Sequence, residues 1–399
     1  MTDREIAKHN RWLLPEAVDE VLPPQAEVLE RLRRELLDCY RSWGYELIMP
    51  PAIEYLDALL TGVAHDLDIQ TFKLTDQLTG RMMGVRADIT PQAARIDAHQ
   101  LRRDCPVRLC YIGTVLQARP EGPTSSRNPV QVGAELYGHA GIESDTEIIA
   151  LMLETLRIAG LQQPHLDLGH VGIFRGLARQ AGVDSAGENR LWNALQRKAS
   201  DEILTILDDL GITGSSRDML SALPELSGGV DVLNRANERL SEADADVHRA
   251  LRELWSIAGA LERWLPGVPL HFDLGELRGY DYHTGVVFAA LVAGHGHEVA
   301  RGGRYDEIGS VFGRSRPATG FSADLKTLFS LSNRESITTG SGIAAPWRDD
   351  AELFAAIRDL RARGERVIWL LPGHEDEVAV MGCDRQLVKT DDGWEVAPL

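Results

Sequence analysis

Residues 111–138, YIGTVLQARPEGPTSSRNPVQVGAELYG, contain two apolar runs separated by a long loop of Pro, Gly, Ser and Thr. Two such runs around a polar loop predict a pair of antiparallel strands. Alternation in the second run places Gln131 and Glu135 on one face of its strand and Val132 on the other. An amide and a carboxylate on a shared face indicate a surface that binds a polar ligand. Few cationic residues lie near them in the sequence.

The overall composition excludes several classes of partner. The chain has 399 residues, enough for two or three domains, and a formal net charge of −18. Nucleic-acid affinity comes mostly from Lys and Arg contacts with phosphates, so we expect no nucleic-acid partner. No stretch has the apolar length of a signal peptide or a membrane span, so we expect no membrane association and a cytoplasmic location.

The four cysteines are too few and too scattered for a disulfide framework or a zinc site. We therefore expect no structural metal and no cofactor. His295 and His297 stand in the glycine-rich AGHGHE segment, which predicts a turn rather than a metal site. Residues 203–216, ILTILDDLGITGSS, superficially resemble a phosphoribosyl-diphosphate loop, but their apolar spacing predicts a helix followed by a turn.

The order of predicted elements indicates an α+β fold. Helical spacing over residues 25–43 is followed by an extended segment and strand pairs. Thr90 is expected to cap a short helix with Pro91 in its first turn. Ser144 or Asp145 is expected to cap the long helix after the quoted hairpin, with Glu147 reaching back.

The predicted secondary structure then changes twice along the chain, and these changes predict the domain organisation. Residues of about 173–265 read as helices, and strands resume after Pro266. We expect an antiparallel sheet flanked by helices over residues 1–331, with this helical stretch as an insertion. A polar linker at 332–342 and a small α/β domain at 343–399 complete the prediction, the latter closed by a hairpin that turns at Asp392-Gly393.

Five motifs in order now resemble those of class II histidyl-tRNA synthetases, over roughly residues 10–330. GYELIMPPAIEY (44–55) resembles the interface motif 1, and the quoted hairpin resembles motif 2. ELRGYDYHTGVVF (276–288) and RGGRYDE (301–307) resemble the two histidine signatures, and PATGFSADLKTLF (317–329) resembles motif 3. The resemblance implies a class II aminoacyl-tRNA synthetase-like sheet and a dimer that forms through motif 1.

The same resemblance implies a binding site for free histidine. An amino acid needs carboxylates for its ammonium group and polar side chains that read its ring. Asp88 stands where the synthetase carries Glu, and His283 stands where it carries Tyr. We also expect Arg304 and Asp306 to close the pocket. The residues implied to contact histidine are Asp88, Thr90, Gln131, Glu135, Arg278, Tyr282 and His283.

Two arginines that clamp ATP in class II synthetases have no counterpart here. Aligned without gaps, the motif 2 position is Gln117 and the motif 3 position is Thr327. Arg119 and Lys326 lie close by, but a neighbouring residue in a strand or helix points to a different face. A guanidinium supplies a permanent charge and a fork geometry that an amide or hydroxyl cannot replace. We therefore expect no adenylation of histidine.

A synthetase fold that lacks the residues for adenylation resembles the regulatory subunits of ATP phosphoribosyltransferase. The segments LTGVAHDLDIQTFKLTDQLTGR (60–81) and VRADITPQAARIDAHQL (85–101) also resemble the sequences of these subunits. The acidic C-terminal segment is also too short for an anticodon-binding domain. The resemblance implies a non-catalytic subunit that activates a short-form catalytic subunit in the first step of L-histidine biosynthesis, with L-histidine as a feedback effector. The alternatives are an active histidine–tRNA ligase and a histidine-binding module that serves another partner.

Overall fold

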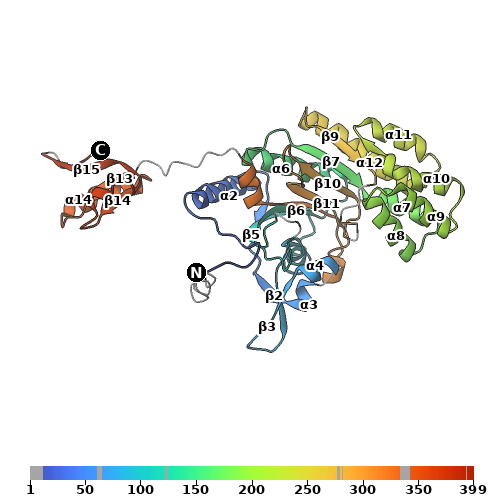
Figure 1. Ribbon diagram of the computed structural model, residues 1–399, viewed down its shortest axis with the longest axis horizontal. Coiled ribbons are helices and arrows are strands. Elements are labelled where there is room, and N and C mark those ends of the chain that lie inside the picture. The colour runs from blue at the N-terminus through green and yellow to red at the C-terminus, as the bar shows by residue number, and fades with distance from the viewer. Residues whose placement is uncertain are drawn as a thin grey trace, which may run out of the picture. The chain divides into compact units, whose positions relative to one another are not determined.

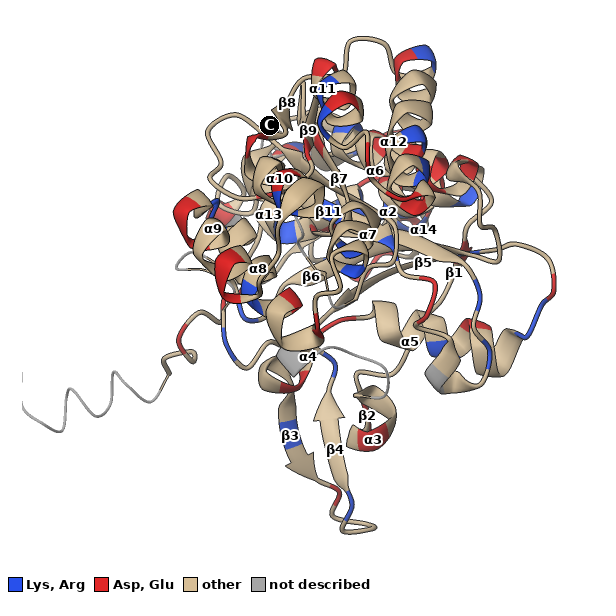
Figure 2. Cartoon of the chain, turned by 90° about the vertical axis from the view of Figure 1, so that its right-hand side faces the viewer, with Lys and Arg blue, Asp and Glu red and all other residues tan. Residues whose placement is uncertain are grey.

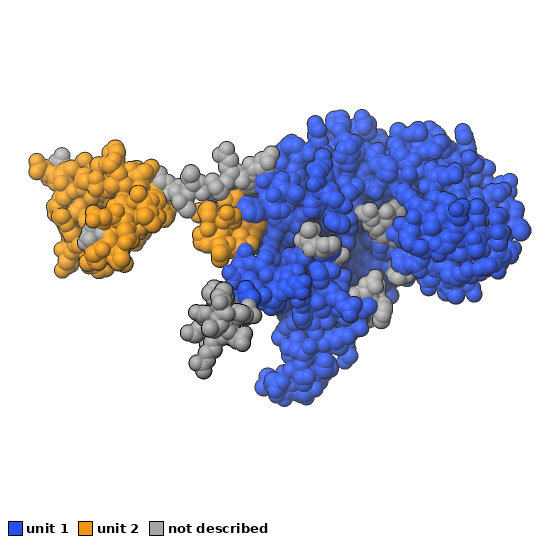
Figure 3. Space-filling model, viewed as in Figure 1, with its two compact units in different colours: residues 1–20, 31–333 blue, residues 21–30, 334–399 orange. Residues whose placement is uncertain are grey.

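The computed structural model describes residues 12–60, 65–120, 122, 125–275, 279–280, 282–332, 342–391 and 393–399. The chain divides into two compact units, shown in different colours in Figure 3. The larger unit comprises residues 1–20 and 31–333, and the smaller comprises residues 21–30 and 334–399. The expected linker at 332–342 falls almost entirely outside the described residues.

The larger unit is built on a nine-stranded mixed sheet with the strand order β1-β5-β6-β12-β11-β10-β7-β9-β8 (Figure 1). From β5 to β7 all neighbours are antiparallel, whereas β1 pairs with β5 and β7 with β9 in parallel. The strands are β1 (Glu46–Leu47), β5 (Val107–Thr114), β6 (Val130–Tyr137), β7 (His165–His170), β8 (Ser227–Gly228), β9 (Leu270–Asp273), β10 (Val286–Leu291), β11 (Ala300–Arg304) and β12 (Ala318–Asp324).

Helix α6 (Ile142–Ala159) lies across β6, β12, β11 and β10, and most of its side chains are buried. Helix α13 (Leu325–Leu331) follows β12 and packs against β6 and α6. Helix α2 (Gln25–Ser42) is followed by Gly44, whose φ of 84° is a backbone conformation that glycine adopts without strain. These helices bury the apolar face of an otherwise amphipathic sheet.

A helical block separates β7 from β9, its neighbour in the sheet (Figure 1). Residues 186–210 do not form one continuous helix, because the chain breaks at Lys198, whose φ is 50°. Residues 203–216 form the expected helix and turn. The helices are α7 (Val171–Gln180), α8 (Ser185–Gln196), α9 (Ser200–Asp209), α10 (Gly214–Ala222), a short 3₁₀ turn (Leu223–Glu225), α11 (Asp231–Arg239) and α12 (Ala245–Trp264).

A second, three-stranded sheet with the order β2-β4-β3 carries a hairpin that projects from the larger unit (Figures 1 and 2). Its elements and those around it are β2 (Ile53–Tyr55), α3 (Leu56–Leu59), α4 (His65–Gln70), β3 (Phe72–Thr75), β4 (Met82–Val85), α5 (Thr90–Arg95), a π-helical turn (Ile96–Leu101) and a 3₁₀ turn (Ser310–Phe312). The segment that joins β4 to α5 turns Asp88 and Thr90 toward the main sheet, where the site lies.

Two of the expected helix caps are wrong. Helix α5 begins at Thr90 itself, and its first turn is held by the carboxylate of Asp88, which accepts a hydrogen bond from the Thr90 amide at 3.0 Å. Helix α6 begins at Ile142, before Ser144 and Asp145, and no described side chain caps it. Both cap predictions relied on local sequence, whereas these polar side chains bind groups from distant parts of the chain.

The smaller unit contains a four-stranded sheet with the order β14-β13-β15-β16 and one helix. The sequence did not indicate its first strand, which is short and begins at the end of the polar segment. Helix α14 is opened by Asp350, whose carboxylate accepts hydrogen bonds from the next turn. The elements are β13 (Gly342–Pro346), α14 (Ala351–Ala362), β14 (Val367–Leu370), a 3₁₀ turn (Glu375–Glu377), β15 (Cys383–Thr390) and β16 (Gly393–Pro398).

The expected α+β class, with its helical insertion and small α/β tail, is therefore confirmed. Among the helices that the structure describes, none combines the length and apolar character that a membrane span requires. Within the same residues, no cluster of three or more His, Cys, Asp or Glu side chains is arranged to hold a metal ion.

Candidate functional site

A cleft of about 860 Å³ opens in the larger unit, over the strands at the centre of the sheet. Its walls come from the start of α5, the loop between β5 and β6, and the strands β6, β10, β11 and β12. Arg278 lies outside the described residues. The other residues expected to contact histidine all line this one cleft: Asp88, Thr90, Gln131, Glu135, Tyr282 and His283.

Glu135 is the most deeply buried polar group of the cleft, with 1% of its surface exposed. Its carboxylate accepts hydrogen bonds from the hydroxyls of Tyr111, at 2.9 Å, and Tyr305. Burial raises the pKa of Glu135 to about 8, although these hydroxyls oppose the rise. The carboxyl group therefore gains much from a ligand that brings a positive charge or a strong donor.

Gln131 and Asp88 form a polar pair near Glu135. The Gln131 side chain donates to the Asp88 carboxylate at 2.6 Å and accepts from the Ile89 amide at 2.8 Å. The same Asp88 oxygen also accepts the amide of Thr90. Because these bonds fix both side chains, the second Asp88 oxygen is held in one position for a donor such as an ammonium group.

Tyr282 and His283 bring unsatisfied polar atoms to the cleft. The Tyr282 hydroxyl and the His283 Nδ1 are buried and have no hydrogen-bond partner among the residues that the structure describes. Burial lowers the pKa of His283 to about 4, so its imidazole is neutral near pH 7. The Tyr282 ring packs against Tyr305 with centroids 5.1 Å apart. Leaving these atoms without a partner is costly, and both belong to residues that line the cleft.

Arg175, on helix α7, holds the segment that carries these two residues. Its guanidinium donates to the carbonyl of His283 at 2.7 Å and to that of Tyr280 at 2.5 Å. It also lies over the Tyr280 ring, 4.4 Å from the ring centroid. A side chain of the helical block therefore holds the backbone carbonyls of Tyr280 and His283.

Gln117 and Thr327, which stand where class II synthetases carry the two ATP-binding arginines, also line the cleft, and neither side chain is charged. The Gln117 backbone pairs with Arg127, while the Thr327 hydroxyl donates to Asp324 at 2.7 Å. The neighbouring cations do not replace the missing arginines. Lys326 forms an ion pair with Asp19 at 3.0 Å, and neither Lys326 nor the exposed Arg119 lines the cleft.

The lining of the cleft is strongly acidic. Among its described residues the only Lys or Arg is Arg301, which pairs with Glu298 at 3.3 Å. The same lining holds four further acidic residues that accompany the largely protonated Glu135: Asp88, Asp167, Glu298 and Asp324. Such a lining attracts an ammonium group and repels a triphosphate.

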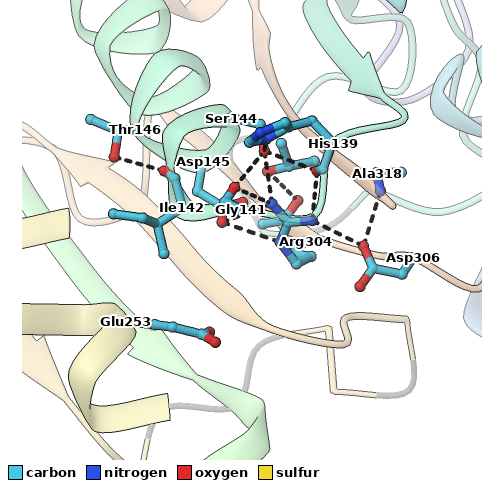
Figure 4. A network of polar contacts seen from close by, with 12 residues as sticks. His139, Gly141, Ile142, Ser144, Asp145, Thr146, Glu253, Arg304, Asp306 and Ala318 are labelled. Carbon is cyan, nitrogen blue, oxygen red and sulfur yellow. Dashed lines mark hydrogen bonds and ion pairs between the residues drawn. The ribbon is translucent and has the colours of Figure 1, made fainter. Parts of the chain in front are cut away.

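The expectation that Arg304 and Asp306 close the pocket is wrong, because neither lines the cleft. Arg304 instead points toward the loop before α6 and the first turn of that helix (Figure 4). It binds the buried Asp145 carboxylate at 2.9 Å and the carbonyls of His139 and Gly141. The second histidine signature thus anchors α6 on the sheet rather than the ligand.

Sequence reasoning missed three residues that shape the site. Tyr111 and Tyr305 position Glu135, and Gly320 lies opposite it in β12. Tyr111 opens the quoted hairpin and Tyr305 stands inside the second histidine signature. For Tyr111, a hydroxyl among otherwise apolar strand residues was the available signal, whereas Tyr305 stands between Arg304 and Asp306 and carried no such signal.

Comparisons with known proteins agree with this geometry. Residues 17–328 match the family model described as histidyl-tRNA synthetase. Residues 340–397 match the one described as ATP phosphoribosyltransferase subunit HisZ C-terminal domain. A solved structure described as an ATP phosphoribosyltransferase regulatory subunit/histidyl-tRNA synthetase from Bacillus halodurans has a TM-score of 0.80 at 27% identity. That match covers 92% of this chain and 96% of the other.

Curated relatives extend over the whole chain. The ATP phosphoribosyltransferase regulatory subunit of Alkalilimnicola ehrlichii is 63% identical and covers 100% of both chains. The protein of the same name from Thioalkalivibrio sulfidiphilus is 58% identical over 98% of this chain and 99% of its own.

The fold is therefore that of the class II histidyl-tRNA synthetase-like proteins. Within this class, the match of residues 340–397 and the full-length relatives both place the chain among the regulatory subunits rather than the synthetases. The chain belongs to the family of ATP phosphoribosyltransferase regulatory subunits.

Proposed function

We propose that this chain is a non-catalytic subunit that activates the short-form ATP phosphoribosyltransferase in the first step of L-histidine biosynthesis. The observation that carries the proposal is a synthetase cleft that keeps its carboxylates but lacks cations at Gln117 and Thr327. Without them, a triphosphate has no charged clamp, so the cleft binds a ligand without activating it. The family membership supports the identity of the catalytic partner.

We further propose that L-histidine is the effector and that it occupies this cleft. Asp88 suits its ammonium group, and Glu135 offers an acceptor to the ring or the amine. The buried polar atoms of Tyr282 and His283 supply further hydrogen bonds. For histidine to regulate the partner, it must bind one state of the complex more tightly than the other, with a coupling of about 1–3 kcal/mol.

Self-association through the motif 1 segment is also part of this proposal. Leu47, Met49 and Ile53 lie in residues 44–55, and their side chains are 44%, 81% and 45% exposed. Exposed apolar side chains gathered in one segment are typical of an interface between subunits. The net charge of −18 and the acidic cleft disfavour nucleic acid as a partner.

Reconstitution tests this function directly. The purified chain is mixed with the short-form catalytic subunit, and the rate of phosphoribosyl transfer is measured with and without L-histidine. We expect a rise in kcat on mixing and a fall when histidine is added. No rise in kcat at saturating concentrations of this chain would contradict the proposal.

The alternative of an active histidine–tRNA ligase has its own assay. ATP–pyrophosphate exchange with histidine should remain at background, because the two clamp positions hold an amide and a hydroxyl. Exchange at the rates of ordinary synthetases would establish the ligase instead. Retained histidine binding without any effect on the phosphoribosyltransferase would indicate a binding module for another partner.

A further inference from the structure

Tyr280 belongs to a turn that lines the cleft, but its side chain packs against the helical block. Gly279, Tyr282 and His283 of this turn line the cleft, whereas Tyr280 does not. The Tyr280 side chain is 4% exposed and lies against helices α7 and α8. Neighbouring residues of one turn therefore face two different parts of the larger unit.

The backbone of this turn is held by hydrogen bonds of its own. The carbonyl of Gly279 accepts from the amides of Tyr282 and His283, both at 2.9 Å. Directly after His283 the chain joins the main sheet, where the Thr284 amide donates to a carbonyl of β11 at 2.7 Å. The sheet therefore holds one end of the turn. Because the turn is so tight, a displacement of Tyr280 at the other end would also displace Tyr282 and His283.

Helix α8 supplies two side chains that contact Tyr280. Glu188 and Trp192 are four residues apart, so they lie on one face of this helix. The Glu188 carboxylate accepts a hydrogen bond from the Tyr280 hydroxyl, and the Trp192 ring stacks on the Tyr280 ring with centroids 6.1 Å apart. The Phe174 ring of α7 lies on the same tyrosine, with centroids 5.5 Å apart. These contacts fix both the orientation of the ring and the position of its hydroxyl.

The two side chains of α8 are not needed to fill the core of the block. Leu191 and Leu195 of the same helix are almost fully buried and already supply its apolar contacts. Glu188 and Trp192 are only half-buried, and neither lines the cleft. Their contacts with Tyr280 therefore serve the turn rather than the packing of α8.

We propose that Glu188 and Trp192 are positioning residues for the effector, because they fix Tyr280 and thereby hold Tyr282 and His283 in the wall of the cleft. The inference rests on the proposed binding of L-histidine in this cleft. The Tyr282 hydroxyl and the His283 Nδ1 are buried without a partner among the described residues. A ligand that bonds to them depends on where they lie, since hydrogen bonds weaken steeply with poor geometry. Helix α8 thus sets the affinity for histidine without touching it.

Calorimetric titration of the full chain with L-histidine tests this role. Glu188→Ala should weaken binding about tenfold, because the buried Tyr280 hydroxyl loses its acceptor and the turn shifts. Glu188→Gln should restore the affinity, because its amide oxygen can accept the same hydrogen bond. Trp192→Ala should weaken binding as well. The matched control is Glu202→Ala, which breaks an exposed pair with Arg197 in the same block and should bind as wild type does.

A further variant separates positioning from a general loss of stability. Leu233 is fully buried in α11, which packs mainly against α12 and β8, so Leu233→Ala should destabilise the block without a specific effect on the turn. Circular dichroism confirms that each variant is folded at the temperature of the titration. An equal loss of affinity in Leu233→Ala and Glu188→Ala would overturn the proposal.

Hydrogen exchange measured by mass spectrometry, without histidine, gives a readout that does not depend on the ligand. The amides of Tyr282 and His283 should exchange faster in Glu188→Ala and at the wild-type rate in Glu188→Gln. Unchanged exchange in Glu188→Ala, or faster exchange with unchanged affinity, would overturn the role of α8. A wild type that binds no histidine would instead contradict the proposed occupant of the cleft, and the exchange rates would still decide whether α8 fixes the turn.

Discussion

Gly320 of β12 stands directly opposite Glu135 of β6, and a Cβ on Gly320 would overlap a carboxylate oxygen of Glu135. The glycine therefore makes room for the carboxyl group beneath the hydroxyl of Tyr305. Its φ is not positive, so space rather than backbone conformation requires glycine here. The position of Glu135, the most buried acid in the cleft, therefore depends on a glycine at the opposite position of β12.

Gly320→Ala should displace Glu135 and weaken the binding of L-histidine. The added methyl group overpacks the site, which should cost about 1–3 kcal/mol of folding free energy. Urea denaturation measures the stability, and isothermal titration calorimetry measures the affinity. Gly296→Ala is the matched control, because a Cβ there meets nothing within 4 Å. Equal affinities in the two variants would contradict this role of Gly320.

The raised pKa of Glu135 should make folding stability depend on pH. Burial raises this pKa from its ordinary value of 4.5 to about 8, so the folded state binds the proton more tightly than the unfolded state. The corresponding stability is complete below about pH 4.5 and is lost as the pH rises toward 8, on the order of 5 kcal/mol in total. The experiment compares urea denaturation of wild type and Glu135→Gln from pH 4.5 to 8.5.

Glutamine cannot titrate, so the difference in unfolding free energy between the two proteins isolates this one group. Wild type should lose stability relative to Glu135→Gln as the pH rises, and the difference should level off above pH 8. A constant difference across the range would show that Glu135 is ionised throughout.

Asp88→Asn should weaken L-histidine binding about tenfold or more, because a hydrogen bond to a charged group contributes about 1.5–3 kcal/mol. Asparagine keeps an oxygen that can accept from the Thr90 amide, so the start of α5 should persist. Calorimetric titration gives the dissociation constant. Glu298→Gln removes a carboxylate of the same cleft that already pairs with Arg301, and it should change the constant far less. The reverse order of the two effects would place the ammonium group elsewhere.

Arg304→Ala should strongly destabilise the larger unit. Arg304 and Asp145 are both buried, and removing one partner of a buried pair costs about 3–5 kcal/mol. Arg190→Ala breaks an exposed pair with Asp209 and should cost at most about 1 kcal/mol. Chemical denaturation compares the two. Similar losses would mean that the network of Figure 4 contributes little to stability.

The sequence placed residues that line the cleft where their geometry is local. Strand alternation placed Gln131 and Glu135 on one face, and β6 carries both into the cleft. Family resemblance added Asp88 and Tyr282 from other parts of the chain. The roles of Tyr111 and Gly320 depend on the register between β5, β6 and β12, which no single segment of sequence determines.

The wrong predictions for Ser144, Asp145 and Arg304 have the same physical origin. Ser144 and Asp145 have the composition of a helix cap, but Arg304 comes from a strand far away in the sequence and binds both. A buried guanidinium needs several acceptors, so tertiary structure overrides the local preference for capping. Arg304 was likewise expected at the ligand because its motif is a signature of histidine enzymes. The structure shows that a residue of such a motif can serve the scaffold instead.

Arg175 links helix α7 directly to the segment that carries Tyr280 and His283. It belongs to the helical block, yet its guanidinium holds the carbonyls of Tyr280 and His283. Any tilt of α7 must therefore displace side chains of this segment that line the cleft. A ligand that fixed those side chains would in turn oppose the tilt of α7. By reciprocity, a ligand of the cleft that stabilised one position of α7 would have its affinity changed, by the same free energy, when another molecule stabilised that position.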